Sequence, residues 1–419
     1  MTNRILIREV LFNGNLTNIL IEGNRFKSLQ ASTNEPADIT IDGKRKAILP
    51  PLYNAHTHAA MTLLRGYADD MPLFRWLTEY IWPYEAKLTK EDIYAGTRLA
   101  ILEMIKSGCV FFNDMYWDIE ETIRATEEMG VRAAIGVTFM DRMSNEVKES
   151  NFGFIKEWND PTEGRIQITV APHAVYTVGA DLLKRCAEVA RQKGLVLHIH
   201  LSETEQEVND CVAAHDMTPV KWLDSLGVLS ENVVAAHVVH VNDEEIATLK
   251  QRGVTIVHNP CSNMKLSSGV FRSQTFEISG CRIALGTDGS SSNNNLDMRE
   301  EMKFAALLAK CQHTPDTLPA STIFEWGTKN GAEAFGIDAG VIEEGKLADA
   351  ILIDIDNERF VPCHNLISNW IYAADSRCID TVICNGRIVM KNGVVPFEED
   401  IIEEARQSCR RIASRLNLK

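Results

Sequence analysis

Histidines are the side chains of this sequence most able to carry chemistry. Only 11 of the 419 residues are histidine, and two pairs of them are separated by a single residue, in NAHTH and in HIHLSE. Imidazole is a common metal ligand and a proton acceptor that works near neutral pH. The histidines that stand in or directly after short apolar runs are His56, His58, His173, His198, His200 and His237, and one acid, Asp288 in LGTD, is placed in the same way.

A single metal ion is the chemistry that this set favours. Three imidazoles and one carboxylate suit Zn²⁺, with Fe²⁺ or Mn²⁺ as alternatives, and they leave a position open for water. Residues i and i+2 of a strand point to the same side, so both histidines of NAHTH can reach one ion. The predicted ligands are His56, His58, His200 and Asp288. The stretch from Glu157 to Leu183 has no lysine that could bridge a second metal, so we expect one ion.

Strand register decides between the two histidines of HIHLSE. We choose His200 as the ligand because Glu203, an acid able to move protons, follows it closely. His198 is then expected in the core or behind the ligands. In HNPCSNM, Asn259 and Asn263 flank a turn, and we expect them either to shape it or to contact the substrate.

The elements that position these residues alternate between strand and helix. Eight short runs rich in Val and Ile end near residues 55, 115, 140, 172, 201, 238, 260 and 288. Near-continuous apolarity is typical of parallel strands buried on both faces. Helices are predicted from Thr89, capped with Asp92 and stopped by Gly108, over Asp181 to Lys193, and over Asp243 to Arg252. This order predicts a (β/α)₈ TIM barrel, whose C-terminal strand ends meet at one mouth, with a doubly wound open sheet as the alternative.

The two ends of the chain differ from the middle. Residues 1–50 show short strand patterns separated by glycines. Residues from 346 onward show the same pattern, with Asn-Gly hairpin turns predicted at 385–386 and 392–393. We therefore expect one small β-sandwich-like domain assembled from residues 1–50 and 346–419. The barrel would occupy residues 51–345, and a surface helix from Glu398 would end the chain.

Composition restricts the class of partner. Lys and Arg number 43 against 58 Asp and Glu, a net charge of −15, which repels phosphate backbones and anionic lipid. No apolar run approaches the roughly 20 residues that cross a bilayer. The 10 cysteines form no CxxC pair, which favours a reducing compartment over a disulfide framework or a thiolate zinc site. We expect a cytoplasmic protein that binds a small molecule, not nucleic acid or membrane.

These residues resemble the amidohydrolase superfamily, in the branch of cytosine deaminase-like and chlorohydrolase-like enzymes. Within it, the sequence is similar to the 5′-methylthioadenosine/S-adenosylhomocysteine deaminases. The resemblance covers nearly the whole chain. It rests on NAHTHAAMTLLRGYADD, the region from Trp76 to Glu85, APHAVYT, HIHLSET, AAHVVH, HNPCSNMKLSSG, LGTDGSSSNNNLDM and EEGKLADAILID.

The resemblance implies an activity and a role for each site residue. It implies a metal-dependent hydrolytic deaminase of an adenine nucleoside, possessing one divalent ion and forming a homo-oligomer. Its motifs place the proton shuttle at Glu203 and assign His237, with Asp288, to the attacking water. Glu85 and His173 match positions that hold ribose hydroxyls, and Trp76 is expected to wall the purine pocket.

One departure from the family's pattern concerns the substrate. Members that accept S-adenosylhomocysteine bring two arginines to its carboxylate, and the matching positions here are Val137 and Val147. A carboxylate that lacks charged donors loses about 1.5–3 kcal/mol. We therefore expect adenosine, 5′-methylthioadenosine or 5′-deoxyadenosine to fit better. Two alternatives stay open: hydrolysis of another heterocycle, such as guanine, cytosine, a pterin or a triazine, and a metal-binding barrel without catalysis.

Overall fold

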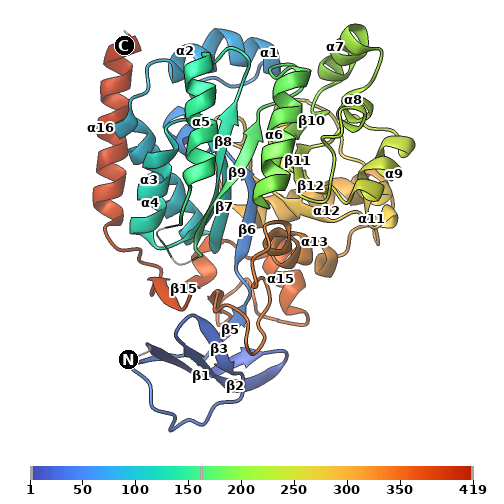
Figure 1. The fold of residues 1–419 in the computed structure, drawn as a ribbon. Helices are drawn as coiled ribbons and strands as arrows, with labels where there is room; N and C mark the ends of the chain where they lie inside the picture. The colour runs from blue at the N-terminus through green and yellow to red at the C-terminus, as the bar shows by residue number, and fades with distance from the viewer. Residues whose placement is uncertain (1–2, 161, 163, 417–419) are drawn as a thin grey trace.

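The computed structural model describes residues 3–160, 162 and 164–416, and its centre is a barrel of eight parallel strands (Figure 1). Its strands run in chain order, each beside the next. The first and last are joined where the Asp288 backbone N–H donates to the His56 carbonyl at 3.0 Å. The predicted TIM barrel is thus confirmed, and the open sheet is not formed. The strands are β6 Leu52–Thr57, β7 Cys109–Tyr116, β8 Arg132–Phe139, β9 Ile166–Pro172, β10 Leu197–Leu201, β11 Val233–His237, β12 Thr255–His258 and β13 Ile283–Leu285.

Helices surround the strands and bury their outer faces. The three predicted helices are present: α3 begins at a capping box of Thr89 and Asp92, while α6 and α9 each end at a glycine with positive φ. Such a glycine accepts the left-handed turn without a Cβ clash. The helices are α3 Lys90–Lys106, α4 Ile119–Met129, α5 Asn145–Glu157, α6 Ala180–Lys193, α7 Glu205–His215, α8 Pro219–Ser225, α9 Asp243–Arg252, α10 Pro260–Lys265, α11 Ser273–Ser279, α12 Met298–Gln312, α13 Ala320–Gly327, α14 Lys329–Ala334 and α15 Leu366–Tyr372.

A segment of short helices lies across the mouth of the barrel, at the end where the strands finish (Figure 1). It comprises a 3₁₀ turn over Ala59–Leu64, α1 Leu73–Trp76, a π-helical turn over Leu77–Ile81 and α2 Trp82–Glu85. Its apolar side chains form a core cluster separate from that of the barrel. The segment therefore closes one side of the space above the strand ends.

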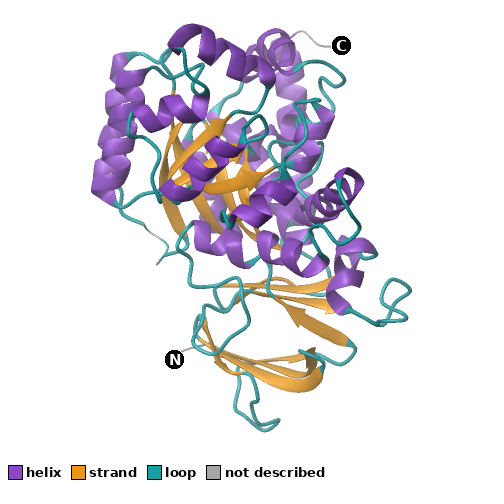
Figure 2. Cartoon of the chain, turned by 90° about the vertical axis from the view of Figure 1, so that its right-hand side faces the viewer, coloured by secondary structure: helices purple, strands orange, loops and turns teal. Residues whose placement is uncertain are grey.

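A second sheet is built from both ends of the chain. Its strands are β1 Arg4–Phe12, β2 Asn15–Glu22, β3 Arg25–Ser28, β4 Ile39–Asp42, β5 Lys46–Leu49, β14 Ala350–Asp354, β15 Ile379–Cys384 and β16 Arg387–Met390. β5 pairs with β14, which joins the two chain ends, and Figure 2 shows the strands in two stacked groups below the barrel. Asn385 and Gly386, both at positive φ, make the predicted hairpin turn. The exact boundary between the two domains stays a prediction.

The C-terminal helix, α16 Glu398–Leu416, packs on the barrel rather than on the sheet (Figure 1). It lies against α3, where the Arg98 guanidinium donates to Glu404 at 2.6 Å. The Arg415 guanidinium donates to Asp92, the residue that also caps α3, at 2.5 Å. We grouped this helix with the sheet because it follows the last strands of the sheet in the chain. The sequence did not indicate which element the helix packs against.

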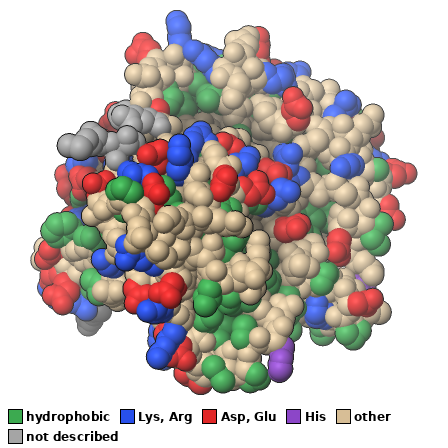
Figure 3. Space-filling view, turned by 90° about the horizontal axis from the view of Figure 1, so that it is seen from below, with side chains coloured by type: hydrophobic (Ala, Val, Ile, Leu, Met, Phe, Trp, Pro, Cys, Tyr) green, Lys and Arg blue, Asp and Glu red, His purple; other side chains and the backbone are tan. Residues whose placement is uncertain are grey.

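The outer surface carries both signs of charge. On the face seen from below, acidic and basic side chains are interspersed (Figure 3). Among the described residues, no helix combines the length and apolarity that spanning a membrane requires.

We expect Asp92→Asn to loosen α16 in a pH-dependent way. Burial alone would raise the pKa of Asp92, but the Arg415 guanidinium and the Thr89 cap hold it below its usual range. A depressed acid stabilises the fold above its unfolded pKa, about 4, and this contribution is lost as the pH falls through the folded value. The variant should lose about 1–3 kcal/mol at pH 7, seen as a lower Tm.

The difference in Tm between the parent and Asp92→Asn should become smaller below pH 4. Glu325→Gln, which changes an exposed acid of α13, is the control and should unfold like the parent. A deficit in Asp92→Asn that is equal at pH 7 and at pH 3 would contradict this assignment.

Candidate active site

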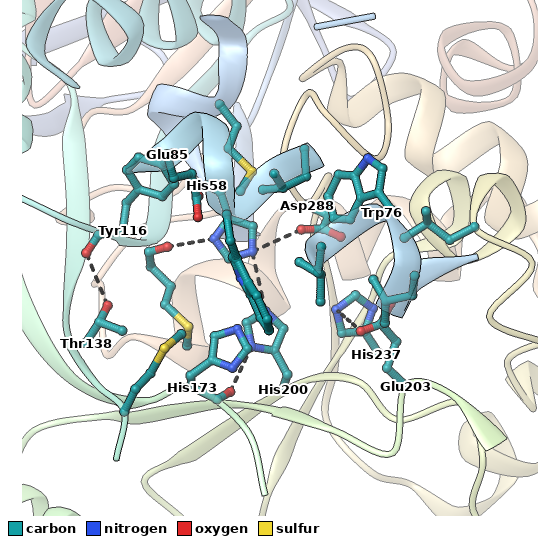
Figure 4. A pocket seen from close by; sticks show the side chains of 18 of the residues that line it. His58, Trp76, Glu85, Tyr116, Thr138, His173, His200, Glu203, His237 and Asp288 are labelled. Atoms are coloured by element: carbon teal, nitrogen blue, oxygen red, sulfur yellow. Dashed lines mark hydrogen bonds and ion pairs between the residues drawn. The ribbon is translucent and has the colours of Figure 1, made fainter. Parts of the chain in front are cut away.

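A pocket opens at the mouth of the barrel, and it gathers the predicted site residues from separate strand ends. His58 follows β6, His173 follows β9, His200 lies on β10 and His237 ends β11. Figure 4 shows these side chains with Asp288 pointing toward one another inside the pocket. The lining residues are His58, Met61, Leu73, Trp76, Leu77, Ile81, Trp82, Glu85, Met115, Tyr116, Trp117, Thr138, Met140, His173, Tyr176, His200, Glu203, His237, Leu266 and Asp288.

The four predicted metal ligands converge at the floor of this pocket. The Asp288 Oδ1 atom lies 3.2 Å from His58 Nε2 and 3.4 Å from His56 Nε2. His200 Nε2 lies 3.4 Å from His58 Nε2. Ligand atoms of His56, His58 and Asp288 lie within 4.8 Å of one another, as do those of His56, His200 and His237. The structure therefore brings together every residue predicted to bind the ion.

The imidazoles of His58 and His200 are oriented by backbone carbonyls. The Met115 carbonyl lies 2.6 Å from His58 Nδ1, and the His173 carbonyl lies 2.8 Å from His200 Nδ1. A carbonyl oxygen can only accept, so each Nδ1 carries the hydrogen and each Nε2 presents its lone pair to the pocket. A hydrogen bond at the second nitrogen is the usual means of fixing a metal-binding histidine.

The buried polar atoms at the floor fit a divalent cation. Among the described residues, the buried His56 Nε2 atom has no hydrogen-bond partner. The lone pairs of His58 and His200 face each other at 3.4 Å. Such an arrangement is costly unless a positive charge lies between the groups. Three imidazole nitrogens and a carboxylate are the donors that a catalytic divalent metal site requires.

Asp288 is held by hydroxyl groups that we did not predict. Ser262 Oγ and Ser292 Oγ donate to its Oδ2 at 2.6 and 3.0 Å, while the Gly289 backbone N–H donates to Oδ1 at 2.8 Å. The stretch Ser290–Asn295 is entirely polar in sequence, yet its three serines are buried. A run of serines directly after a candidate ligand was the only sequence signal for this role.

His237 and Glu203 form the second part of the site. The Asn263 amide oxygen accepts from His237 Nδ1 at 2.9 Å, and Asn259 accepts from the His237 backbone N–H at 3.3 Å. The His237 Nε2 atom is left 3.8 Å from Glu203 Oε2. These two asparagines thus support a site residue. Neither of our two expectations for them, shaping the turn or contacting the substrate, described this support of His237.

Glu203 is placed by its neighbours and kept away from water. Its Oε1 accepts from Ser268 Oγ at 3.2 Å. The buried carboxylate of Glu207 accepts from the backbone N–H groups of Ser202 and Glu203, each at 2.8 Å, and so fixes the end of β10. Burial raises the pKa of Glu203. A raised pKa favours the protonated form of this carboxyl group, the form that a proton donor requires.

The three predicted substrate contacts line the same pocket. Trp76 is buried, and its indole N–H donates to the Ala68 carbonyl at 3.0 Å, which holds the ring against the pocket. His173 Nδ1 lies 2.9 Å from Thr177 Oγ1. Glu85 stands beside His58 in Figure 4, and burial raises its pKa. Their contact with a substrate stays a prediction.

Comparison with known proteins agrees with this geometry. The amidohydrolase family model matches residues 47–389. The 5-methylthioadenosine/S-adenosylhomocysteine deaminase 1 of Archaeoglobus fulgidus is 45% identical over 415 residues, 98% of this chain and 97% of that protein. The 5′-deoxyadenosine deaminase of Methanosphaera stadtmanae is 44% identical over 402 residues, 94% and 95% of the two chains. An adenosine deaminase structure from Xanthomonas campestris with bound zinc has a TM-score of 0.93 and 32% identity, over 98% of both chains. The chain belongs to the amidohydrolase family.

Substitution of one predicted ligand should release the metal without unfolding the protein. We expect His200→Ala to lower zinc affinity by more than about 100-fold, since even residues that merely support a ligand contribute 10–100-fold. Competition with a chromophoric chelator measures this affinity. His215→Ala is the matched control because His215 is exposed at the end of α7, away from the pocket. Equal zinc affinity in the two variants would contradict the ligand assignment.

Proposed function

We propose that this protein is a zinc-dependent hydrolytic deaminase of adenine nucleosides, with His56, His58, His200 and Asp288 as the metal ligands. The observation that carries the proposal is the convergence of these side chains beside His237 and Glu203 in one buried pocket. The names of the relatives support the substrate class, since they are deaminases of 5-methylthioadenosine and S-adenosylhomocysteine and of 5′-deoxyadenosine. The zinc in the Xanthomonas structure supports the choice of ion.

The residues around the ion divide the proton transfers between them. When bound, zinc lowers the pKa of a water molecule and so supplies a nucleophile at neutral pH. His237 and Asp288 orient that water and take its proton. Glu203 gives a proton to ring nitrogen 1 of adenine, which makes carbon 6 electrophilic. The water oxygen bonds to carbon 6 and gives its second proton, through Glu203, to the amino group. The carbon–nitrogen bond then breaks and ammonia leaves. The proton taken by His237 and Asp288 replaces the one that Glu203 gave to ring nitrogen 1. One water is consumed for each ammonia released.

Two further polar groups of the pocket suit the ribose. Glu85 and His173 line the same pocket as Trp76, which supplies an apolar wall for the purine. A carboxylate accepts from two neighbouring hydroxyls, and such contacts favour a nucleoside over a free base. Glu85 and His173 are therefore our candidates for holding the 2′ and 3′ hydroxyls.

A side cavity next to the pocket supports a preference for uncharged 5′ groups. It shares Tyr116, Trp117 and Thr138 with the pocket, and both Val137 and Val147 line it. Its charged lining residues are acids, Asp118 and Glu120, and none of the residues that line it is Lys or Arg. A carboxylate would find no charged donor in this cavity, whereas a methylthio group would contact apolar side chains.

Loss of the Glu203 carboxylate should remove turnover while leaving the metal in place. We expect Glu203→Gln to lower kcat for adenosine by about 10²–10⁴-fold, the usual contribution of a positioned proton donor. Ammonia release and the absorbance change of adenine to hypoxanthine measure it. The control is Glu205→Gln, an exposed acid two residues later. Undiminished turnover by Glu203→Gln would rule out the proton-transfer role.

A substrate panel tests the 5′ preference. S-adenosylhomocysteine should be deaminated with a kcat/KM about 10–150-fold below that of 5′-methylthioadenosine, which matches the free energy of the missing charged donors. Val147 is 46% exposed, so Val147→Arg should be tolerated and should narrow the gap. Val212→Arg, at an exposed valine of α7, is the control.

Two results of the panel would contradict the proposal at different levels. A parent enzyme that prefers S-adenosylhomocysteine would overturn the account of Val137 and Val147. If guanine released ammonia and no adenine nucleoside did, the substrate would be a free base and not a nucleoside.

A further inference from the structure

His198, the first histidine of HIHLSE, lies directly behind a predicted metal ligand. His198 Nε2 is 2.8 Å from His56 Nδ1, and His198 Nδ1 is 2.8 Å from the Val234 carbonyl oxygen on the neighbouring strand β11. Both histidines are completely buried. No role in the proposed reaction has yet been given to this side chain.

The direction of these two hydrogen bonds follows from the chemistry of the acceptor. The Val234 carbonyl can only accept, so His198 Nδ1 must carry the hydrogen. A neutral imidazole has one N–H, and His198 Nε2 is therefore an acceptor. His56 Nδ1 must then donate to it, which leaves the lone pair of His56 on Nε2. That atom is the one that is buried without a partner at the floor of the pocket.

His56 differs from the other imidazoles of the site in how it is held. Backbone carbonyls hold His58 and His200, and a carbonyl oxygen can accept a hydrogen bond but cannot donate one. The support of His56 is another imidazole, which could either donate or accept. The Val234 carbonyl fixes the direction of this hydrogen bond, because it accepts from His198 Nδ1 and leaves His198 Nε2 as an acceptor. Val234 is paired with His198 in the register of β10 and β11.

We propose that His198 is a positioning residue for the metal site. It keeps the hydrogen of His56 on Nδ1 and so directs the His56 Nε2 lone pair to the ion, through a chain that ends at the Val234 carbonyl. The inference rests on the proposed metal site, but not on the identity of the substrate. Its test is the binding of zinc, so failure of the proposed deaminase activity would leave the result unaffected.

Zinc affinity of two variants tests the acceptor directly. His198→Phe keeps an aromatic ring but offers no acceptor to His56, and it should lower zinc affinity by about 10–100-fold. His198→Gln retains an amide oxygen that can accept the same hydrogen bond, and its affinity should lie close to that of the parent. Zinc alone is the probe, titrated against a chromophoric chelator, with circular dichroism as the test of folding.

His258→Phe is the matched control for loss of a buried imidazole. His258 ends the strand after β11, is completely enclosed, and stacks on Phe271 with ring centroids 4.2 Å apart. Neither ring nitrogen of His258 has a hydrogen-bond partner in the part of the chain that the structure describes. This variant should keep the zinc affinity of the parent. A folded His198→Phe that binds zinc as tightly as the parent overturns the proposal, as does an equal loss in His198→Gln.

Nuclear magnetic resonance of the zinc-loaded parent, labelled with ¹⁵N in histidine, tests the chain even if His198→Phe fails to fold. The expected spectrum has a hydrogen on His198 Nδ1, none on Nε2, and a coupling across the hydrogen bond between His56 Nδ1 and His198 Nε2. A hydrogen on His198 Nε2 would overturn the proposal.

Discussion

The site depends on a hydrogen bond at the Nδ1 atom of each imidazole, which leaves the Nε2 atom free to face the ion. His58 and His200 donate this bond to backbone carbonyls, and His237 donates its own to the Asn263 amide. Each ring then has one nitrogen left, Nε2, which turns toward the common centre. Lone pairs that converge in a buried space repel one another and lack water, so the arrangement is favourable only around a cation. The protein thus prepares a metal site through hydrogen bonds made elsewhere.

The barrel maintains this arrangement because its strands fix the acceptors as well as the ligands. The carbonyls that hold the imidazoles belong to neighbouring strands or to their ends, so ligand and support move together. Ser202, His237 and Asp288 all have positive φ, at 50°, 72° and 63°. Such conformations cost non-glycine residues about 1–3 kcal/mol each and persist where surrounding structure enforces them. Here they turn the chain sharply at the strand ends, where the functional side chains must face inward.

The fold and the candidate ligands were predictable because each can be recognised from a short stretch of sequence. Apolar runs define strands, and polar residues that follow them must meet at the mouth once a barrel is assumed. His56, His58, His200 and Asp288 were recognised in this way, although their roles as ligands await the zinc experiment. The hydroxyls on Asp288 were not predictable, because Ser262 lies on α10 and Ser292 in the loop after Asp288, and only the folded chain brings them together.

Packing partners were equally beyond the sequence. The periodicity of Glu398–Leu416 predicts a helix, but it does not predict that the helix packs on α3. An amphipathic pattern shows that one face is buried without identifying the element that buries it. His198 was expected in the core or behind the ligands, yet its contact with His56 crosses the barrel between strands far apart in the chain and could not be predicted. The functions of such residues emerge from distances, not from motifs.

Anomalous X-ray scattering from crystals grown with zinc tests the central claim most directly. Data collected on either side of the zinc absorption edge locate the ion without reference to any assumed chemistry. We expect one strong peak per chain within about 2.0–2.3 Å of the Nε2 atoms of His56, His58 and His200 and of the Asp288 carboxylate. A pocket without a peak under saturating zinc, or a peak bound by other residues, would contradict the account.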